Sequence, residues 1–244
     1  MKLIPESDFR SYIPCAESIA LCRVFPLSVV EGIQSGSVFT DDSGSCGLIR
    51  HRSGFSYLWG SPDEVFLREV YDLVIGGAKL ICGDERICGL FSRWGEVVLV
   101  PRNIYSYPND TVIKTELPAG FAACKIDADL FRRLVGRVTP AMYWDSSEQF
   151  CSGGTGICIM HGGEPAAWAF TSAVSSDEAD IGIETAEGYR RRGLAFAAAS
   201  MTIAEVLPRR RPTWSCQLSN EGSNRTAERL GFVKTGECLM IRKA

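Results

Sequence analysis

The sequence lacks several features that mark common functional classes. It has only two histidines, His51 and His161, and none of its ten cysteines forms a Cys-x-x-Cys pair, so the ligand spacing of a structural zinc site is absent. No uninterrupted apolar run approaches the ~20 residues that span a bilayer. Its 26 basic and 29 acidic side chains give a net charge of −3, which disfavours a nucleic-acid-binding surface. We therefore expect no metal, membrane or nucleic-acid partner.

The N-terminus and the cysteines predict a cytoplasmic protein. Lys2, Glu6, Asp8 and Arg10 interrupt any apolar segment that could serve as a secretory signal. Most cysteines lie in apolar segments, as Cys158 does, which is typical of core residues in a reducing compartment. The sequence leaves the oligomeric state open, a homodimer included.

The length of 244 residues allows one large domain or two modest ones. We predict a smaller N-terminal α/β unit of unknown role over residues 1–120. Its clearest helix signal starts with Ser61 as the cap, Pro62 in the first turn, and an apolar periodic run that stops at Gly76. Strand candidates lie around this helix at residues 37–40, 46–49, 55–59 and 96–100.

The C-terminal half, residues 121–244, has a more regular pattern. A helix is expected at 127–135 and a loop at 136–150, and Gly162-Gly163 suits a tight hairpin turn. No internal repeat is visible at the periods of solenoid proteins. The fold class is α/β (α+β) with a mixed sheet and the order β-β-β-α-β-α-β, over residues 157–160, 166–174, 180–185, 193–207, 213–218, 222–230 and 232–242.

The third and fourth strands of this half are joined by a crossover helix, which makes them parallel. Ligands of such sheets bind beyond the carboxyl ends of the strands. Those ends are Thr185 and Leu218, so we expect the site in the two loops that follow them.

The loop after Thr185 carries three arginines, Arg190 to Arg192, directly before a helix. Positive charge is unfavourable at a helix N-terminus unless an anion compensates it. Free N–H groups there bind anions, and Gly193 and Ala195 leave room for a phosphate group. A second run, Arg209 to Arg211, lies at the other end of the same helix, where it needs no ligand. The first run therefore predicts a phosphate site.

Polar residues also follow the next strand. Ser219 and Asn220 precede a helix that ends at Gly231-Phe232, and they suit helix caps as well as ligand contacts. Both roles stay open.

These motifs resemble the GCN5-related N-acetyltransferase (GNAT) superfamily. Arg190, Gly193 and Ala195 match its acetyl-CoA signature, and the segment from Asn220 to Phe232 is similar to its second motif. The resemblance covers about residues 125–244. A closer similarity, to the zwittermicin-A-resistance type of bacterial GNAT proteins, rests on residues 38–42, 55–60, 154–158, 168, 181–185, 192–195, 214–216, 220 and 223.

The resemblance implies transfer of an acetyl group from acetyl-CoA, as cosubstrate, to a small amine by direct attack on the thioester. In that family the strand before the loop pairs with the pantetheine arm and donates an N–H to the thioester oxygen. The implied cofactor contacts are Ile183, Glu184, Thr185, Arg190, Arg191, Arg192, Gly193, Leu194, Ala195, Asn220 and Ser223.

Amine attack requires removal of a proton, for which a carboxylate suits. Glu184 and Asp180 lie on the right strand, and Glu184 could alternatively orient substrate or a loop amide. Many GNAT enzymes place a tyrosine acid where this chain has Ala227, which leaves Ser223, Cys216 or water as substitutes. The chain stops at Ala244, so the usual closing strand is short or absent, and the N-terminal half is expected to cover that edge.

Two other functions are consistent with the same residues. A non-catalytic acyl-CoA-binding or regulatory module would explain Ala227. A nucleotide-phosphate enzyme is disfavoured, because no P-loop string is present. The acceptor amine is left undefined; the N-terminal half and the loop around Tyr143-Trp144-Asp145 would select it, although those aromatics also suit core positions.

Overall fold

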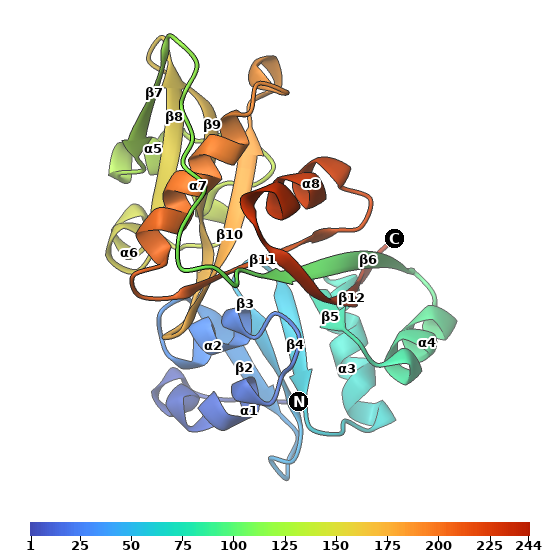
Figure 1. Ribbon diagram of the computed structural model, residues 1–244. Helices are drawn as coiled ribbons and strands as arrows, with labels where there is room; N and C mark the ends of the chain where they lie inside the picture. Colours follow the sequence, from blue (N-terminus) through green and yellow to red (C-terminus); the bar gives the residue numbers. More distant parts are fainter. The chain divides into compact units, whose positions relative to one another are not determined.

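The computed structural model describes residues 1–244, and the chain forms two compact units (Figure 1). The first unit comprises Met1–Ile104, Cys216–Asn220 and Thr235–Ala244, and the second comprises Tyr105–Ser215 and Glu221–Lys234. The units therefore differ from the predicted division at residue 120, because two segments of the C-terminal half pack with the N-terminal one.

The first unit combines helices with a mixed set of strands. Strands β2 to β4 form an antiparallel meander, β5 pairs parallel with β4, and the last strand of the chain pairs antiparallel with β5. The elements are β1 (Lys2–Leu3), η1 (Glu6–Tyr12), α1 (Ile13–Glu17), α2 (Val24–Val30), β2 (Gly36–Thr40), β3 (Gly47–His51), β4 (Phe55–Trp59), α3 (Glu64–Ile75), β5 (Lys79–Cys82), α4 (Glu85–Trp94), β6 (Val97–Ser106) and β12 (Val233–Lys243).

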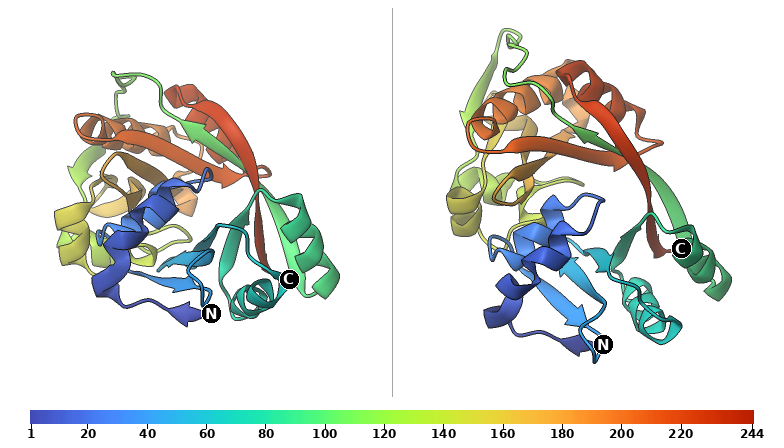
Figure 2. Two further views of the ribbon diagram at one scale, coloured as in Figure 1. Left: turned by 90° about the horizontal axis from the view of Figure 1, so that it is seen from below. Right: turned by 60° about the horizontal axis from the view of Figure 1, so that its bottom comes forward.

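Helices cover both faces of these strands, and α1 and α2 lie on the opposite side from α3 and α4 (Figure 2). Leu48 and Leu80 belong to the buried cluster formed with α3 and α4. On the other face, the Phe25 ring of α2 lies 5.4 Å from the His51 ring and 6.1 Å from the Tyr57 ring. Side chains of alternate strand residues thus pack into two separate cores, one on each face of the sheet.

The second unit contains the first six elements of the predicted order β-β-β-α-β-α-β, and the seventh, β12, belongs mainly to the first unit. Together they confirm the mixed α/β fold class. Gly162 and Gly163 have φ values of +58° and +86° and form the predicted tight turn. Strand β7 and helix α6 were not predicted. The elements are β7 (Phe121–Lys125), α5 (Ala128–Arg133), η2 (Pro140–Met142), α6 (Ser147–Gly153), β8 (Gly156–His161), β9 (Glu164–Val174), β10 (Glu178–Thr185), η3 (Glu187–Tyr189), α7 (Leu194–Val206), β11 (Arg211–Gln217) and α8 (Glu221–Leu230).

Helix α7 is the crossover between the parallel strands β10 and β11. It packs against β8, β9 and β10, and Figure 1 shows it lying across these strands. Its buried face includes the small side chains of Ala197 and Ala198, which allow close approach to the sheet. The Thr202 hydroxyl donates a hydrogen bond to the Ala169 carbonyl beneath it. This hydrogen bond joins the middle of α7 to β9.

Strands from both halves of the chain close the expected open edge. Leu239 of β12 is the register partner of Cys82 in the first unit. The Leu218 N–H donates to the Pro101 carbonyl in the first unit, and the Tyr107 N–H donates to the Pro212 carbonyl in the second. Residues of the N-terminal half thus provide backbone partners for the C-terminal strands.

All ten cysteines are free thiols, and six of them are buried. Burial raises the pKa of the Cys158 thiol to about 12, which keeps it protonated and unreactive. The predicted core role is confirmed for those six.

No group of three or more His, Cys, Asp or Glu side chains is placed to hold a metal ion. None of the helices combines the length and apolar character needed to cross a membrane.

The cap of α3 differs from the prediction. Asp63, not Ser61, is the N-cap, and its carboxylate accepts a hydrogen bond of 2.8 Å from the Phe66 N–H. The prediction of Ser61 was wrong because the helix starts at Glu64, which puts Pro62 outside the first turn. Asp63 also places negative charge at the positive end of the helix dipole.

We expect Asp63→Ala to lower the free energy of unfolding by about 1 kcal/mol, because one N–H group of the first turn loses its acceptor. Ser61→Ala is the matched control and should leave the free energy of unfolding unchanged. Urea denaturation followed by tryptophan fluorescence measures both. Equal losses in the two variants would contradict the assignment of the cap.

Candidate functional site

Strands β10 and β11 are paired over only part of their length. The parallel register joins Glu178–Asp180 to Arg211–Thr213, and from Ile181 to Thr185 strand β10 pairs with β9 alone. Backbone groups on that edge of β10 are open to an extended ligand. The last four residues of β10 are half-buried, so a ligand can reach this edge.

The arginine loop leads from β10 into an uncapped helix. Arg190, Arg191 and Arg192 are exposed, Arg191 has φ +61°, and Gly193 is the N-cap of α7 with φ +76°. No side chain caps α7, and its first turn contains no acidic residue. The first N–H groups of α7 therefore have no side-chain acceptor, and three cations lie directly before them. This arrangement favours an anion.

Tyr189 anchors the loop to the tip of the β8–β9 hairpin. Its hydroxyl lies 3.3 Å from Nδ1 of His161, and its ring meets the Phe121 ring edge-on with centroids 6.0 Å apart. The Arg192 guanidinium lies 5.7 Å from the centre of the Tyr189 ring. These contacts support the left-handed backbone of the loop. No sequence pattern predicts them, because His161 and Tyr189 are 28 residues apart in the chain.

Glu184 lies on the aromatic face of the strands. Gly182 and Glu184 are the register partners of Phe170 and Trp168. A Cβ at Gly182 would lie 3.0 Å from the Phe170 ring, whereas the register shift falls between Asp180 and Ile181. The glycine therefore marks a close approach of Phe170 and is not itself a bulge.

A loop lies over this carboxylate. A Cβ at Gly136 would be 3.3 Å from Cγ of Glu184 and 3.1 Å from the Trp168 ring. The Trp168 indole N–H donates to the Val138 carbonyl at 2.8 Å and holds the same loop. Glu184 is half-buried, in a setting made of aromatic rings and backbone.

Asp180 is fixed at the point where the strands diverge. It is 6% exposed, and its carboxylate accepts hydrogen bonds from the hydroxyls of Ser172 at 2.6 Å and Thr213 at 3.4 Å. It thereby links three neighbouring strands. Of the two predicted carboxylates, Glu184 is the more accessible to a substrate.

The remaining predicted residues lie in α8 or directly before it. The Ser223 hydroxyl accepts a hydrogen bond of 3.1 Å from the Trp214 indole, and Ala227 is fully buried. Asn220 is exposed, belongs to the first unit, and donates its N–H to the Gln217 carbonyl.

The loop before α6 divides its aromatics between core and surface. Trp144 is fully buried and donates to the Thr171 carbonyl, so it is a core residue. Tyr143 is half-buried, with its ring 5.7 Å from that of Phe170. Only Tyr143 of the two aromatics is placed near the face that carries Glu184.

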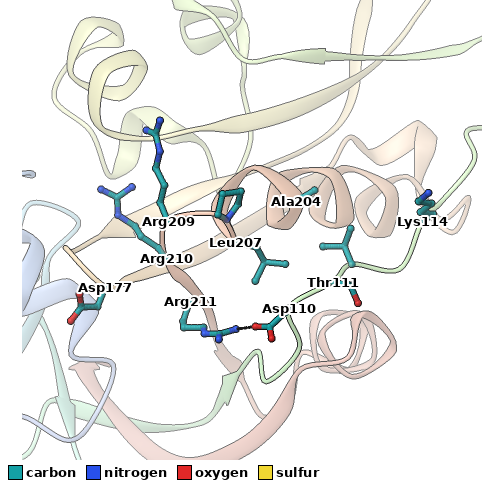
Figure 3. Close-up of a pocket in the computed structure, with 11 residues that line it drawn as sticks. Asp110, Thr111, Lys114, Asp177, Ala204, Leu207, Arg209, Arg210 and Arg211 are labelled. Atoms are coloured by element: carbon teal, nitrogen blue, oxygen red, sulfur yellow. Dashed lines mark hydrogen bonds and ion pairs between the residues drawn. The ribbon is translucent and has the colours of Figure 1, made fainter.

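The second arginine run lies at an open cavity of about 650 Å³ at the C-terminal end of α7 (Figure 3). Arg211 forms an ion pair with Asp110 at 2.7 Å, and Arg210 donates to the Ser175 carbonyl. These cations have protein partners at the negative end of the helix dipole, as expected. None of the predicted site residues is in the lining, which comprises Asp110, Thr111, Val112, Lys114, Asp177, Ala204, Leu207, Pro208, Arg209, Arg210 and Arg211.

The open edge of β10, the uncapped α7 and the arginines between them adjoin one another in the chain, and their backbone groups and charges suit an extended ligand that carries a phosphate. A family model described as GNAT acetyltransferase matches residues 22–239. The chain therefore belongs to the GNAT acetyltransferase family and is an N-acetyltransferase by class.

Individual relatives match nearly the whole chain in sequence or in fold. An uncharacterized N-acetyltransferase of Bacillus subtilis, YdfB, is 27% identical over 234 residues, which is 88% of each chain. A GCN5-related N-acetyltransferase-like protein from Streptococcus suis has a TM-score of 0.78 at 22% identity, covering 98% of this chain and 100% of that one. A GCN5-related N-acetyltransferase from Kribbella flavida has a TM-score of 0.59 at 15% identity, covering 94% and 95%.

We expect Gly193→Ala to lower the free energy of unfolding by about 1–2 kcal/mol, because an L side chain is strained at this left-handed position. Gly188→Ala, in the same loop, is the control. A Cβ at Gly188 meets nothing within 4 Å, and no positive φ is required there. Thermal denaturation of both variants checks the prediction; equal stabilities would show that the loop is not held in this conformation.

Proposed function

We propose that this protein transfers an acetyl group from acetyl-CoA to a small amine. The observation that carries the proposal is the uncapped N-terminus of α7, reached through three exposed arginines from the open edge of β10. A pyrophosphate supplies the anion that this arrangement favours. The extended pantetheine arm suits the strand edge from Ile181 to Thr185.

The residues present fit acetyl-CoA as cosubstrate. Backbone groups of Ile183, Glu184 and Thr185 would hold the pantetheine arm and the thioester. The arginines and the N–H groups of Gly193, Leu194 and Ala195 would hold the phosphates, and Asn220 and Ser223 would add polar contacts. Residues 121–244 are thus the proposed acetyl-CoA-binding domain, and the zwittermicin-A-resistance type is the proposed subfamily. A cytoplasmic location suits ten free thiols.

The proposed reaction joins the acceptor nitrogen to the acetyl carbon and breaks the carbon–sulfur bond. Glu184 takes the amine proton directly or through a water molecule, and the coenzyme leaves as a thiolate that Ser223, Cys216 or water protonates. The Tyr143 ring, which is half-buried and packs on Phe170 at the face that carries Glu184, would favour a cationic amine. Buried Asp180, whose carboxylate is occupied by two hydroxyls, is the weaker candidate for the base.

We expect Arg190→Ala to weaken acetyl-CoA binding about tenfold to a hundredfold, because a charged hydrogen bond to phosphate is lost. Arg209→Ala removes the same charge at the other end of α7 and should leave the affinity unchanged. Isothermal titration calorimetry measures both. If the intact protein binds no acetyl-CoA, or both variants lose affinity equally, the proposed site is wrong.

We expect Glu184→Gln to lower kcat by about 10²- to 10⁴-fold at saturating acetyl-CoA, since the amine proton loses its acceptor. Acetyl-CoA affinity should stay near that of the wild type. Glu187→Gln, on the exposed loop beyond the strand, is the control. Thiol release measured over a panel of polyamines, amino acids and amino-containing antibiotics gives the rates. Full activity of Glu184→Gln with loss in Asp180→Asn would move the base to Asp180.

A further inference from the structure

The first half of the chain repeats the element order of the second half. Each half begins with a strand, two helices and a three-stranded meander, and continues with helix, strand, helix and strand. In order, β1, α1, α2, β2, β3, β4, α3, β5, α4 and β6 correspond to β7, α5, α6, β8, β9, β10, α7, β11, α8 and β12. Short 3-10 turns are the only additions.

The strand pairings repeat as well. The first strand pairs antiparallel with the meander in both halves, and both meanders are antiparallel. The strands joined by the crossover helix are parallel in both. The length of this parallel pairing is also the same. Three residue pairs join Phe55–Tyr57 to Lys79–Ile81 in the first half. Three join Glu178–Asp180 to Arg211–Thr213 in the second.

The last strands are exchanged. The sequence of neighbours is β1-β2-β3-β4-β5-β12 for one half and β7-β8-β9-β10-β11-β6 for the other. Strand β12 is antiparallel to β5. Strand β6 runs antiparallel to β11, since Leu218 bonds to Pro101 and Tyr107 to Pro212. Each half is thus completed by the final strand of the other.

We propose that the N-terminal half is a second copy of the acetyltransferase fold, which exchanges its last strand with the C-terminal copy and whose own cofactor opening is closed by its own residues. The two halves share no sequence motif, since neither motif of the second half recurs in the first. The proposal rests on topology and pairing, and it goes beyond the acetyl-transfer activity.

The helix N-terminus of the first copy is already occupied. Helix α3 corresponds to α7, and its N-cap Asp63 accepts the Phe66 N–H, with Glu64 following in the first turn. Two carboxylates therefore stand where the second copy has Gly193 and three arginines. Negative charge at this position repels a phosphate and satisfies the dipole without one.

The chain is also closely packed where it leaves β4. A Cβ at Gly60, the first residue after β4, would lie 2.2 Å from the Ser45 carbonyl oxygen and 2.8 Å from Cα of Cys46. Trp59, the last residue of β4, is 6% exposed, whereas Thr185, the last residue of β10, is half-buried. The first copy therefore contributes structure and a strand, and the chain has one cofactor site.

Hydrogen exchange on the full chain tests the strand exchange. Ile241 of β12 is fully buried in the cluster formed by α3, α4 and β5. We expect Ile241→Ala to lower amide protection at least tenfold in α3, α4 and β5, and to leave β8 to β10 unchanged. Ile203→Ala, an equally buried position in α7, should do the reverse. Loss of protection confined to the second unit in Ile241→Ala would overturn the exchange. If this variant does not fold, Ile241→Val replaces it.

The number of acetyl-CoA molecules bound per chain, measured by calorimetry, tests whether the first copy lacks a cofactor site. The intact chain should bind one acetyl-CoA, and Arg190→Ala should show no second site of higher affinity. Two molecules per chain, or a site that the Arg190 substitution does not touch, would overturn the closure. A chain that binds no acetyl-CoA contradicts the proposed function instead, and the exchange experiment still decides whether the copies share their last strands.

Discussion

The separation of β10 from β11 is the constraint on which the candidate site depends. The two strands pair over three residue positions and then part at Asp180, whose carboxylate holds the hydroxyls of Ser172 and Thr213. Beyond that point β10 keeps one partner and one open edge. The buried carboxylate ties β10 to β9 and β11 at the last paired position, directly below the opening.

The electrostatics of α7 follow from its two ends. Its N-terminus has no side-chain cap and faces three exposed arginines, whereas the arginines at its C-terminus are bound to Asp110 and to the Ser175 carbonyl. Arginines therefore have different roles at the two ends of this helix. Those before its N-terminus suit an anion, and those after its C-terminus complement the helix dipole and contact the neighbouring loop.

The sequence predicted most of the second unit, because its apolar periodicities are long and its turns carry glycine. It also placed the arginine loop at the start of α7, since motif and helix pattern coincide there. It could not show that Tyr189 meets His161, that Gly136 lies over Glu184, or that Asp180 is held by two hydroxyls, since these contacts join residues distant in sequence. In the first unit, Ser61 and Asp63 both suit a cap, and only the start of α3 at Glu64 decides between them.

The pairing of β12 with β5 has a consequence for biosynthesis. A ribosome releases the N-terminal half long before Leu239 exists to pair with Cys82. Until then the edge of β5 and the cluster around Leu67 and Phe91 lack Ile241, and a strand edge without its partner invites pairing with other chains. The first unit therefore completes its fold only after β12 has been synthesised. Its final folding step pairs residues far apart in sequence, and such steps are slow. Chaperone protection of the nascent chain is most needed in that interval.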